Sequence, residues 1–210
     1  MKCCLKSDIV ILKDLYSHAQ QDLSGRGLHG NSPVGREYKK TAKKLTEKIP
    51  QKRGFYLWGK YSDHGLWNNI YLGKAGYGKI ANLHNRILEE MGDERCCIWA
   101  SVLSAIQISD VLKEKHGDMW NKKYYANFRR SMRKCGSSHI VWVATPDLTN
   151  KEVGDVEADL IETLNPSANI MRPAPPDDSD HVQEHSNTII GCMKKLIHAN
   201  RAERFPTDHV

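Results

Sequence analysis

A small set of residues with reactive side chains occurs in short phrases between residues 54 and 169. The phrases are Gly54-Phe55-Tyr56, Tyr71-Leu72-Gly73-Lys74, a single Arg86, Glu157 within 156–161, and Asn165-Pro166-Ser167-Ala168-Asn169. A guanidinium grips phosphate through paired hydrogen bonds, and one carboxylate holds Mg²⁺ while water completes the octahedron. A phenol is a poor base at neutral pH unless a cation, here Lys74, lies beside it. Such side chains together suit hydrolysis of a phosphodiester, which needs an activated water and charge stabilisation.

The order of these phrases, and the kind of element that each sits on, resembles the GIY-YIG nucleases. The resemblance spans residues 54 to 169, about half of the 210-residue chain. It implies an α+β fold with a small three-stranded antiparallel or mixed sheet flanked by helices. It also implies an endonuclease that hydrolyses DNA phosphodiester bonds with Mg²⁺ or Mn²⁺. The size and the additions beyond this core are most like a stand-alone restriction-type enzyme.

The resemblance assigns the metal and the phosphate to two residues. Glu157 is implied as the metal ligand, and Asp159 and Glu162 on the same expected helix rank below it. Arg86 is implied as the clamp on phosphate, since the family places an arginine on the helix after the second phrase.

The same resemblance assigns the activation of water to the tyrosines. One of Tyr56 and Tyr71 is implied to help activate the water, and the other to position or relay. From its position directly after Leu72-Gly73, we expect Lys74 to supply a charge beside them or to touch phosphate. Asn169 closes the family pattern and has a mainly structural role there.

One position departs from the family pattern. Many members carry a histidine about one helical turn after the arginine, where this chain has Glu89 and Glu90. His84 faces a different way on a helix. Lys74 or a histidine from elsewhere in the chain therefore replaces the family histidine, or water activation depends on Tyr56 alone. A basic nucleic-acid-binding protein without catalysis, on a degenerate form of this fold, is the alternative function, and a repair or mobile-element nuclease is the sibling within the class.

Positive charge is concentrated in two segments. Residues 36–53 and 113–134 each hold eight basic and two acidic residues, a net +6 apiece, whereas the whole chain is only +6. Clustered base suits a polyanion such as nucleic acid, and the alternative is a pair of solvated helix faces. The candidate DNA contacts are Lys43, Lys44, Arg53, Lys79, Arg129, Arg130 and Arg133.

The elements that must position these residues follow from the apolar pattern. Helices are expected over 8–23, 35–48, 80–91, 104–116, 120–134, 149–164 and 187–204. Strands are expected over 54–58, 70–72, 97–102 and 139–145. Turn-forming residues between the first two strands predict a hairpin.

Three segments are expected from this pattern. They are an N-terminal helical DNA-contacting extension (1–52), a nuclease core with a helical insertion at about 103–135 (53–172), and an acidic proline-rich linker with a final helix (173–210). Double-stranded DNA is the expected partner, and cutting both strands of a palindrome predicts a homodimer. The six cysteines form no Cys-x-x-Cys, so we expect free thiols. Apolar runs are too short to span a bilayer and no signal peptide is evident. We therefore expect no membrane association and a cytoplasmic protein of prokaryotic or phage-like type.

Overall fold

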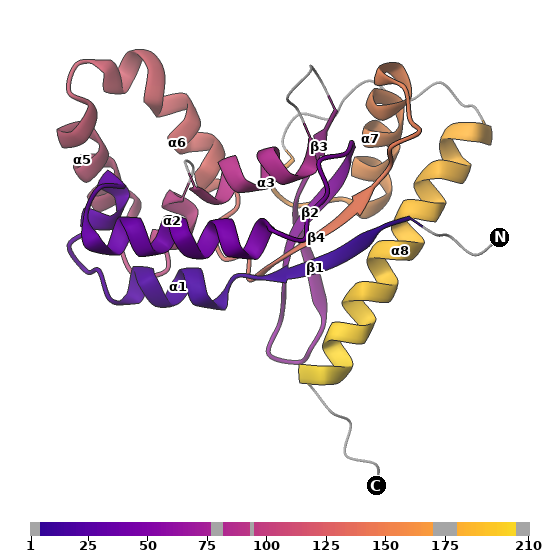
Figure 1. Cartoon of the computed structure of the whole chain (residues 1–210), viewed down its shortest axis with the longest axis horizontal. Coiled ribbons are helices and arrows are strands. Elements are labelled where there is room, and N and C mark those ends of the chain that lie inside the picture. Colours follow the sequence, from indigo (N-terminus) through magenta and orange to yellow (C-terminus); the bar gives the residue numbers. More distant parts are fainter. Residues whose placement is uncertain (1–4, 77–81, 93–94, 170–179, 205–210) are drawn as a thin grey trace, which may run out of the picture.

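The fold is built on one antiparallel sheet with helices on both faces (Figure 1). The computed structural model describes residues 5–76, 82–92, 95–169 and 180–204, without the side chains of 202–204. The strands are β1 (Ser7–Ile11), β2 (Gly54–Tyr61), β3 (Trp67–Ala75) and β4 (His139–Ala144). Their order across the sheet is β1-β4-β2-β3, so β3 is an edge strand and β2 lies inside. The α+β expectation is confirmed.

Alternation along β2 divides the core into two halves. Tyr56 and Trp58 pack into one apolar cluster and Phe55 and Leu57 into the other, because successive side chains of a strand point to opposite faces. All four side chains are buried, as are those of β4, since both faces of these inner strands are covered by helices.

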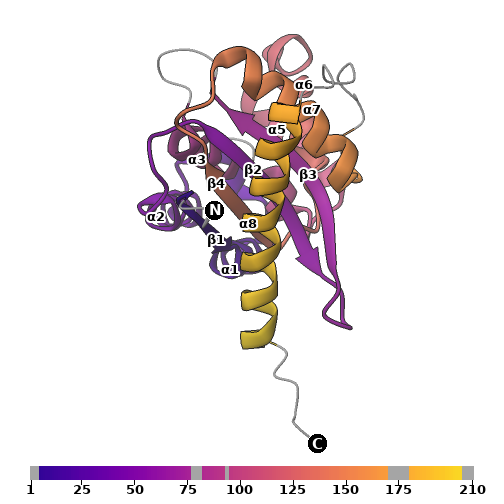
Figure 2. The same ribbon diagram turned by 90° about the vertical axis from the view of Figure 1, so that its right-hand side faces the viewer.

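One face of the sheet is covered by the N-terminal and middle helices. These are α1 (Lys13–Gln20), a short 3₁₀ turn (Arg26–His29), α2 (Pro33–Thr46), α3 (Leu83–Gly92), α4 (Cys96–Trp99), α5 (Ala105–His116), a π-helical turn (Trp120–Tyr124) and α6 (Tyr125–Met132). The other face is covered by α7 (Asn150–Leu164) and the long α8 (Asp180–Arg204), which runs across the strands in Figure 2. Arg86 on α3 and Glu157 on α7 therefore approach the sheet from opposite layers (Figure 1).

Local signals explain where the principal helices begin. Ser32 caps α2 by accepting a hydrogen bond from the backbone N–H of Gly35, and Pro33 follows at the first helical position. Thr149 and Glu152 form a reciprocal capping box at the start of α7, which is the helix that carries Glu157. The expected helices over 35–48, 104–116 and 149–164 are confirmed within a few residues as α2, α5 and α7.

Two sequence expectations about the elements are wrong. The helix expected over 8–23 begins only at Lys13, because Ile9-Val10-Ile11 lies in β1, which pairs with β4. A run of β-branched residues suits a pleated strand, and this strand makes the sheet four-stranded rather than three-stranded. The strand expected over 97–102 is instead the buried helical turn α4, Cys96–Trp99. Short apolar runs do not distinguish a strand from a buried helix.

Smaller differences concern the ends of elements. The hairpin strands are longer than expected, and the final helix begins at Asp180 rather than near 187. The basic helix expected over 120–134 is interrupted by the π-helical turn before α6. Most of the acidic proline-rich linker lies outside the described residues. Within the described part of the chain, no helix combines the length and apolarity that crossing a bilayer requires.

Candidate active site

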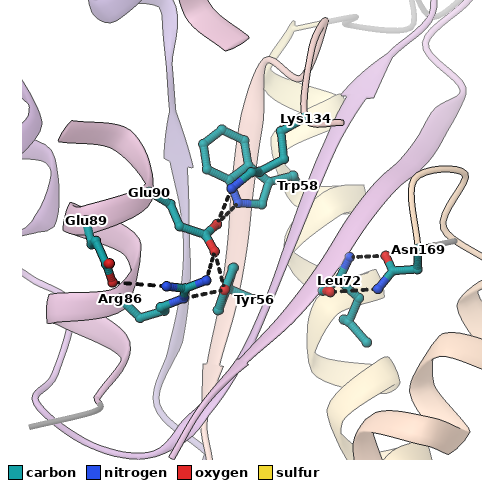
Figure 3. A network of polar contacts seen from close by, with 8 residues as sticks. All are labelled: Tyr56, Trp58, Leu72, Arg86, Glu89, Glu90, Lys134 and Asn169. Atoms are coloured by element: carbon teal, nitrogen blue, oxygen red, sulfur yellow. Dashed lines mark hydrogen bonds and ion pairs between the residues drawn. The ribbon is translucent and has the colours of Figure 1, made fainter. Parts of the chain in front are cut away.

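Tyr56 and Arg86 meet on the face of the sheet that α3 covers (Figure 3). The Arg86 Nε–H donates to the Tyr56 hydroxyl oxygen at 3.3 Å, and the Tyr56 hydroxyl donates to Glu90 Oε1 at 2.7 Å. Arg86 Nη2 also contacts Glu90 Oε1 at 2.9 Å, because Glu90 lies one turn further along α3. The tyrosine and the arginine selected from separate phrases are thus in direct contact.

A glycine in the second phrase allows this arrangement. Gly73 on β3 lies opposite Tyr56 on β2, and a Cβ built on Gly73 would lie 2.3 Å from the Tyr56 ring. Tyr56 therefore lies flat across β3 in space that any other residue would fill. The Gly of the phrase Tyr71-Leu72-Gly73 has a steric role in holding Tyr56.

Glu90 is the centre of the network although the sequence pattern did not select it. Its side chain is fully buried, and its Oε2 accepts hydrogen bonds from Trp58 Nε1 at 3.1 Å and from Lys134 Nζ at 3.0 Å. Lys134 is fully buried as well and follows α6. Glu90 stands one turn after Arg86, where many GIY-YIG nucleases carry a histidine. The spacing from Arg86 could have identified Glu90 from the sequence. Nothing in the sequence separates Lys134 from the other basic residues of its segment.

A second ion pair joins β3 to α7. Lys74 Nζ lies 2.7 Å from Glu157 Oε2, and the two side chains keep 21% and 18% of their exposure. Apolar Val153, Val156 and Leu160 anchor α7 in the core, so Glu157 comes up beside the edge strand. The lysine thus contacts the expected metal ligand rather than Tyr56.

Tyr71 lies on the same face of the sheet as Tyr56 and packs against the same apolar cluster. It is half-buried on β3 opposite Trp58, and its ring centroid is 5.3 Å from Lys134 Nζ. Burial and then the charge of Glu90 raise the pKa of Tyr71, while Lys134 and Arg86 act to lower it and Glu157 adds to the increase. Its hydroxyl has no hydrogen-bond partner among the described residues. Tyr71 therefore offers a protonated hydroxyl to a ligand.

The electrostatics of Tyr56 and Arg86 fix their charge states. Burial, then the negative charge of Glu90, raises the pKa of Tyr56 well above its ordinary value. Burial acts to lower the pKa of Arg86, but the neighbouring Tyr56 and Glu90 outweigh this effect and raise the pKa above its ordinary value. Tyr56 is therefore a neutral phenol and Arg86 a guanidinium cation. The cation beside Tyr56 does not make it a tyrosinate.

Asn169 binds the edge of the sheet. Its Oδ1 accepts from the Leu72 backbone N–H and its Nδ2 donates to the Leu72 carbonyl, both at 2.9 Å (Figure 3). The side chain imitates the pairing of another strand at this point of β3, and it lies apart from the Glu90 network. This contact fits the structural role that the resemblance implies.

The candidate DNA contacts differ in how accessible they are. Lys43 and Lys44 are exposed on α2, and Arg129 and Arg130 are exposed on α6, with Arg133 half-exposed after it. Arg53 is half-buried and donates to the Leu148 carbonyl at 2.7 Å, which ties β2 to the loop before α7. Lys79 lies outside the described residues.

Glu157 is suited to hold a divalent cation. Its carboxylate retains some exposure and already holds an ammonium group, so a cation is accommodated against this oxygen. Over residues 5–76, 82–92, 95–169 and 180–204, no group of three or more His, Cys, Asp or Glu side chains that could hold a metal comes together. A single carboxylate oxygen can hold a hydrated Mg²⁺, which keeps several of its waters, and at Glu157 such an ion would compete with Lys74.

Comparisons with protein-family models, with curated proteins and with solved structures find no match.

Proposed function

We propose that this protein is a divalent-metal-dependent endonuclease that hydrolyses phosphodiester bonds of double-stranded DNA. The observation that carries the proposal is that residues from separate phrases pair with one another on the two faces of the sheet at strands β2 and β3. Tyr56 contacts Arg86 at 3.3 Å, Lys74 contacts Glu157 at 2.7 Å, and Tyr71 feels the charges of both groups. These are the side-chain types that phosphodiester hydrolysis requires.

Arg86 neutralises the phosphate in the proposed site. It is 26% exposed, and its Nη1 is held by the half-exposed Glu89 at 3.0 Å. An incoming phosphate displaces Glu89 and takes the outer side of the guanidinium, while Glu90 and Tyr56 keep hold of the inner side. A guanidinium fixed in this way opposes the charge that develops on the phosphoryl oxygens.

Tyr71 orients the attacking water. Its hydroxyl is protonated, half-buried and without a described partner, whereas the Tyr56 hydroxyl is already committed to Glu90. A hydroxyl in this position accepts one hydrogen of a water and directs its lone pair towards phosphorus. Of the two roles that the resemblance leaves open for the tyrosines, we assign positioning of Arg86 to Tyr56 and contact with water to Tyr71.

Glu157 would hold the divalent cation, and Lys74 Nζ beside it would add positive charge near a phosphate oxygen. A cation bound there supplies Lewis-acid stabilisation of charge on the phosphoryl and leaving oxygens. Glu157 and Arg86 then act on the scissile phosphate from the two layers that flank β3.

Charge on the protein surface supports duplex DNA as the substrate. The two segments of net +6 lie on α2 and on the α5–α6 region, both on the Arg86 side of the sheet (Figure 1). Exposed Lys43, Lys44 and Arg129 on these helices suit contacts to phosphates on either side of the site. Cutting at a defined sequence on both strands, as restriction enzymes do, would need two copies of this site in a homodimer.

The test compares the unmutated protein with Glu157→Gln and Glu162→Gln on a long mixed-sequence duplex with Mg²⁺ or Mn²⁺. Glu162 is exposed on the same helix and makes a matched control. We expect cleavage by the unmutated protein and by Glu162→Gln, and a loss of at least about 10²-fold in Glu157→Gln. Equal cleavage by both variants would exclude Glu157 as the metal ligand.

A nucleic-acid-binding protein without catalysis is the second candidate. It is favoured by the carboxylates Glu89 and Glu90, which occupy Arg86 where the family has a histidine. Retained DNA binding without cleavage under either metal would select it. Fragments of defined length would select a restriction-type enzyme over the repair or mobile-element sibling.

A further inference from the structure

Lys134 is a buried lysine that takes no direct part in the proposed reaction. Its side chain and that of Glu90 are both inaccessible to solvent, and their Nζ and Oε2 atoms lie 3.0 Å apart. Lysine is almost never fully buried unless it is paired, since removing an ammonium group from water is costly. Lys134 follows the inserted α5–α6 region and lies far along the chain from Glu90, so the pair is a long-range contact.

The hydrogen bonds of Glu90 show what Lys134 prevents. Oε1 accepts from the Tyr56 hydroxyl and from Arg86 Nη2, and Oε2 accepts from Trp58 and Lys134 (Figure 3). An arginine beside an unoccupied carboxylate forms a two-pronged pair with both oxygens. Lys134 fills the second oxygen, and Arg86 therefore keeps its Nε on Tyr56 and its Nη1 at the surface.

The same geometry argues against Glu90 as a proton acceptor. A carboxylate offers about four lone-pair positions. Those of Glu90 face Tyr56, Arg86, Trp58 and Lys134, and the group is closed to solvent. Glu90 thus holds its neighbours in place and leaves no position for a water.

We infer that Lys134 is a positioning residue of the active site, which acts through Glu90 to keep the Arg86 guanidinium directed at the phosphate. This inference rests on the proposed nuclease function. It makes the inserted segment part of the active site as well as a source of DNA contacts, because the insertion supplies the cation that locks Glu90.

The experiment measures single-turnover cleavage and DNA affinity for Lys134→Met and for Lys194→Met, which changes an exposed lysine of α8 in the other layer. Lys134→Met is expected to cut about 10²-fold more slowly while its DNA affinity stays within about threefold, because Lys134 does not touch solvent. Lys194→Met is expected to cut at the unmutated rate. A folded Lys134→Met protein that cuts at the unmutated rate would overturn the inference.

A double variant separates positioning from folding. Glu90→Gln with Lys134→Met removes both buried charges and is expected to restore the melting temperature that Lys134→Met lowers, but not the cleavage rate. Recovery of the rate as well would show that Lys134 merely neutralises Glu90, and would contradict the inference.

A readout without cleavage keeps the two proposals distinguishable. The NMR signal of the Arg86 Nε–H, identified by its loss in Arg86→Lys, is expected to shift and to exchange faster in Lys134→Met, because Arg86 swings away from Tyr56. An unchanged signal would overturn the inference. If the unmutated protein cuts no DNA, the proposed function fails, and this signal alone decides whether Lys134 positions Arg86.

Discussion

At the residue scale, the site combines a closed and an open half. Tyr56, Trp58 and Lys134 are buried and each donates a hydrogen bond to the buried Glu90, whereas Tyr71 is only half-buried. In the proposed reaction the closed half fixes geometry and the open half meets water. The proposal thus gives the two tyrosines different roles, because their surroundings differ.

The raised pKa of Tyr71 makes its role testable by pH. A phenol whose pKa is raised above its ordinary value stays protonated at every pH below about 10. Tyr71→Phe is therefore expected to lower the cleavage rate by about the same factor, on the order of 10²-fold, at pH 7 and at pH 9. A rate ratio that grows about tenfold per pH unit would show a tyrosinate base and contradict this assignment.

Glu89 is expected to restrain DNA binding. It is 52% exposed and pairs with Arg86 Nη1, the atom that the proposal gives to the phosphate. Glu89→Gln should tighten binding to a short duplex about two- to fivefold at low salt, since a half-exposed ion pair contributes at most about 1 kcal/mol. Glu114→Gln, which removes an exposed charge from α5, is the control for net charge. Equal gains in both variants would mean that Glu89 has no specific role.

At the scale of elements, β3 brings the two halves together. One of its side chains, Lys74, pairs with α7, another, Tyr71, lies beside Lys134, and Gly73 leaves room for Tyr56. The outer edge of β3 is closed by Asn169. A single strand therefore sets the positions of residues from four other parts of the chain.

A matched pair of glycine substitutions tests this role of β3. A methyl group at Gly73 would lie 2.3 Å from the Tyr56 ring, whereas one at Gly76 meets only side-chain atoms at 3.5 Å or more. Gly73→Ala should destabilise the protein by about 1–3 kcal/mol and abolish most cleavage, because Tyr56 must leave Glu90. Gly76→Ala should change stability by less than about 0.5 kcal/mol. Urea denaturation measures both, and equal stability of the two variants would refute the steric account.

The sequence predicted the elements that carry a clear period and missed those that depend on distant partners. α7 has apolar residues at helical spacing and a capping box, and it appeared where expected. Ile9-Val10-Ile11 fits a helix face or a strand equally well, and only pairing with β4, far along the chain, decides for the strand. The turn at Cys96–Trp99 was misread for the same reason.

The same distinction holds within the candidate site. Tyr56, Tyr71, Lys74, Arg86 and Glu157 were selected because each belongs to a phrase, and the contacts among them accord with that selection. Glu90 and Lys134 were missed because burial of a charge has no local signature. A lysine in a run of basic residues is expected at the surface.

At the scale of the whole molecule, the two layers of helices differ in charge and have different roles in the proposed reaction. The layer with α2, α3, α5 and α6 carries Arg86 and both basic segments, whereas the layer with α7 and α8 carries Glu157. Duplex DNA bound along the first layer would reach the edge strand β3, which lies between the two layers. Positive charge on the first layer is therefore expected to matter for DNA binding.

Neutralising the first layer should weaken both the binding of DNA and the dependence of that binding on salt. The variant with Lys43, Lys44, Arg129 and Arg130 changed to Gln should lower the slope of log affinity against log salt by about 1 for each phosphate that the protein no longer neutralises. The control changes Lys194 and Lys195, exposed on α8 in the other layer, and should leave the slope unchanged. A reduced slope only in the control would place the DNA on the opposite face.

The decisive experiment is cleavage of a long mixed-sequence DNA duplex by the unmutated protein with Mg²⁺, beside Arg86→Ala and a sample containing a metal chelator. We expect cut DNA with the unmutated protein alone and none in the other two samples. Intact DNA under Mg²⁺ and Mn²⁺, with the protein folded and bound to the duplex, would contradict it and leave a DNA-binding protein without catalysis.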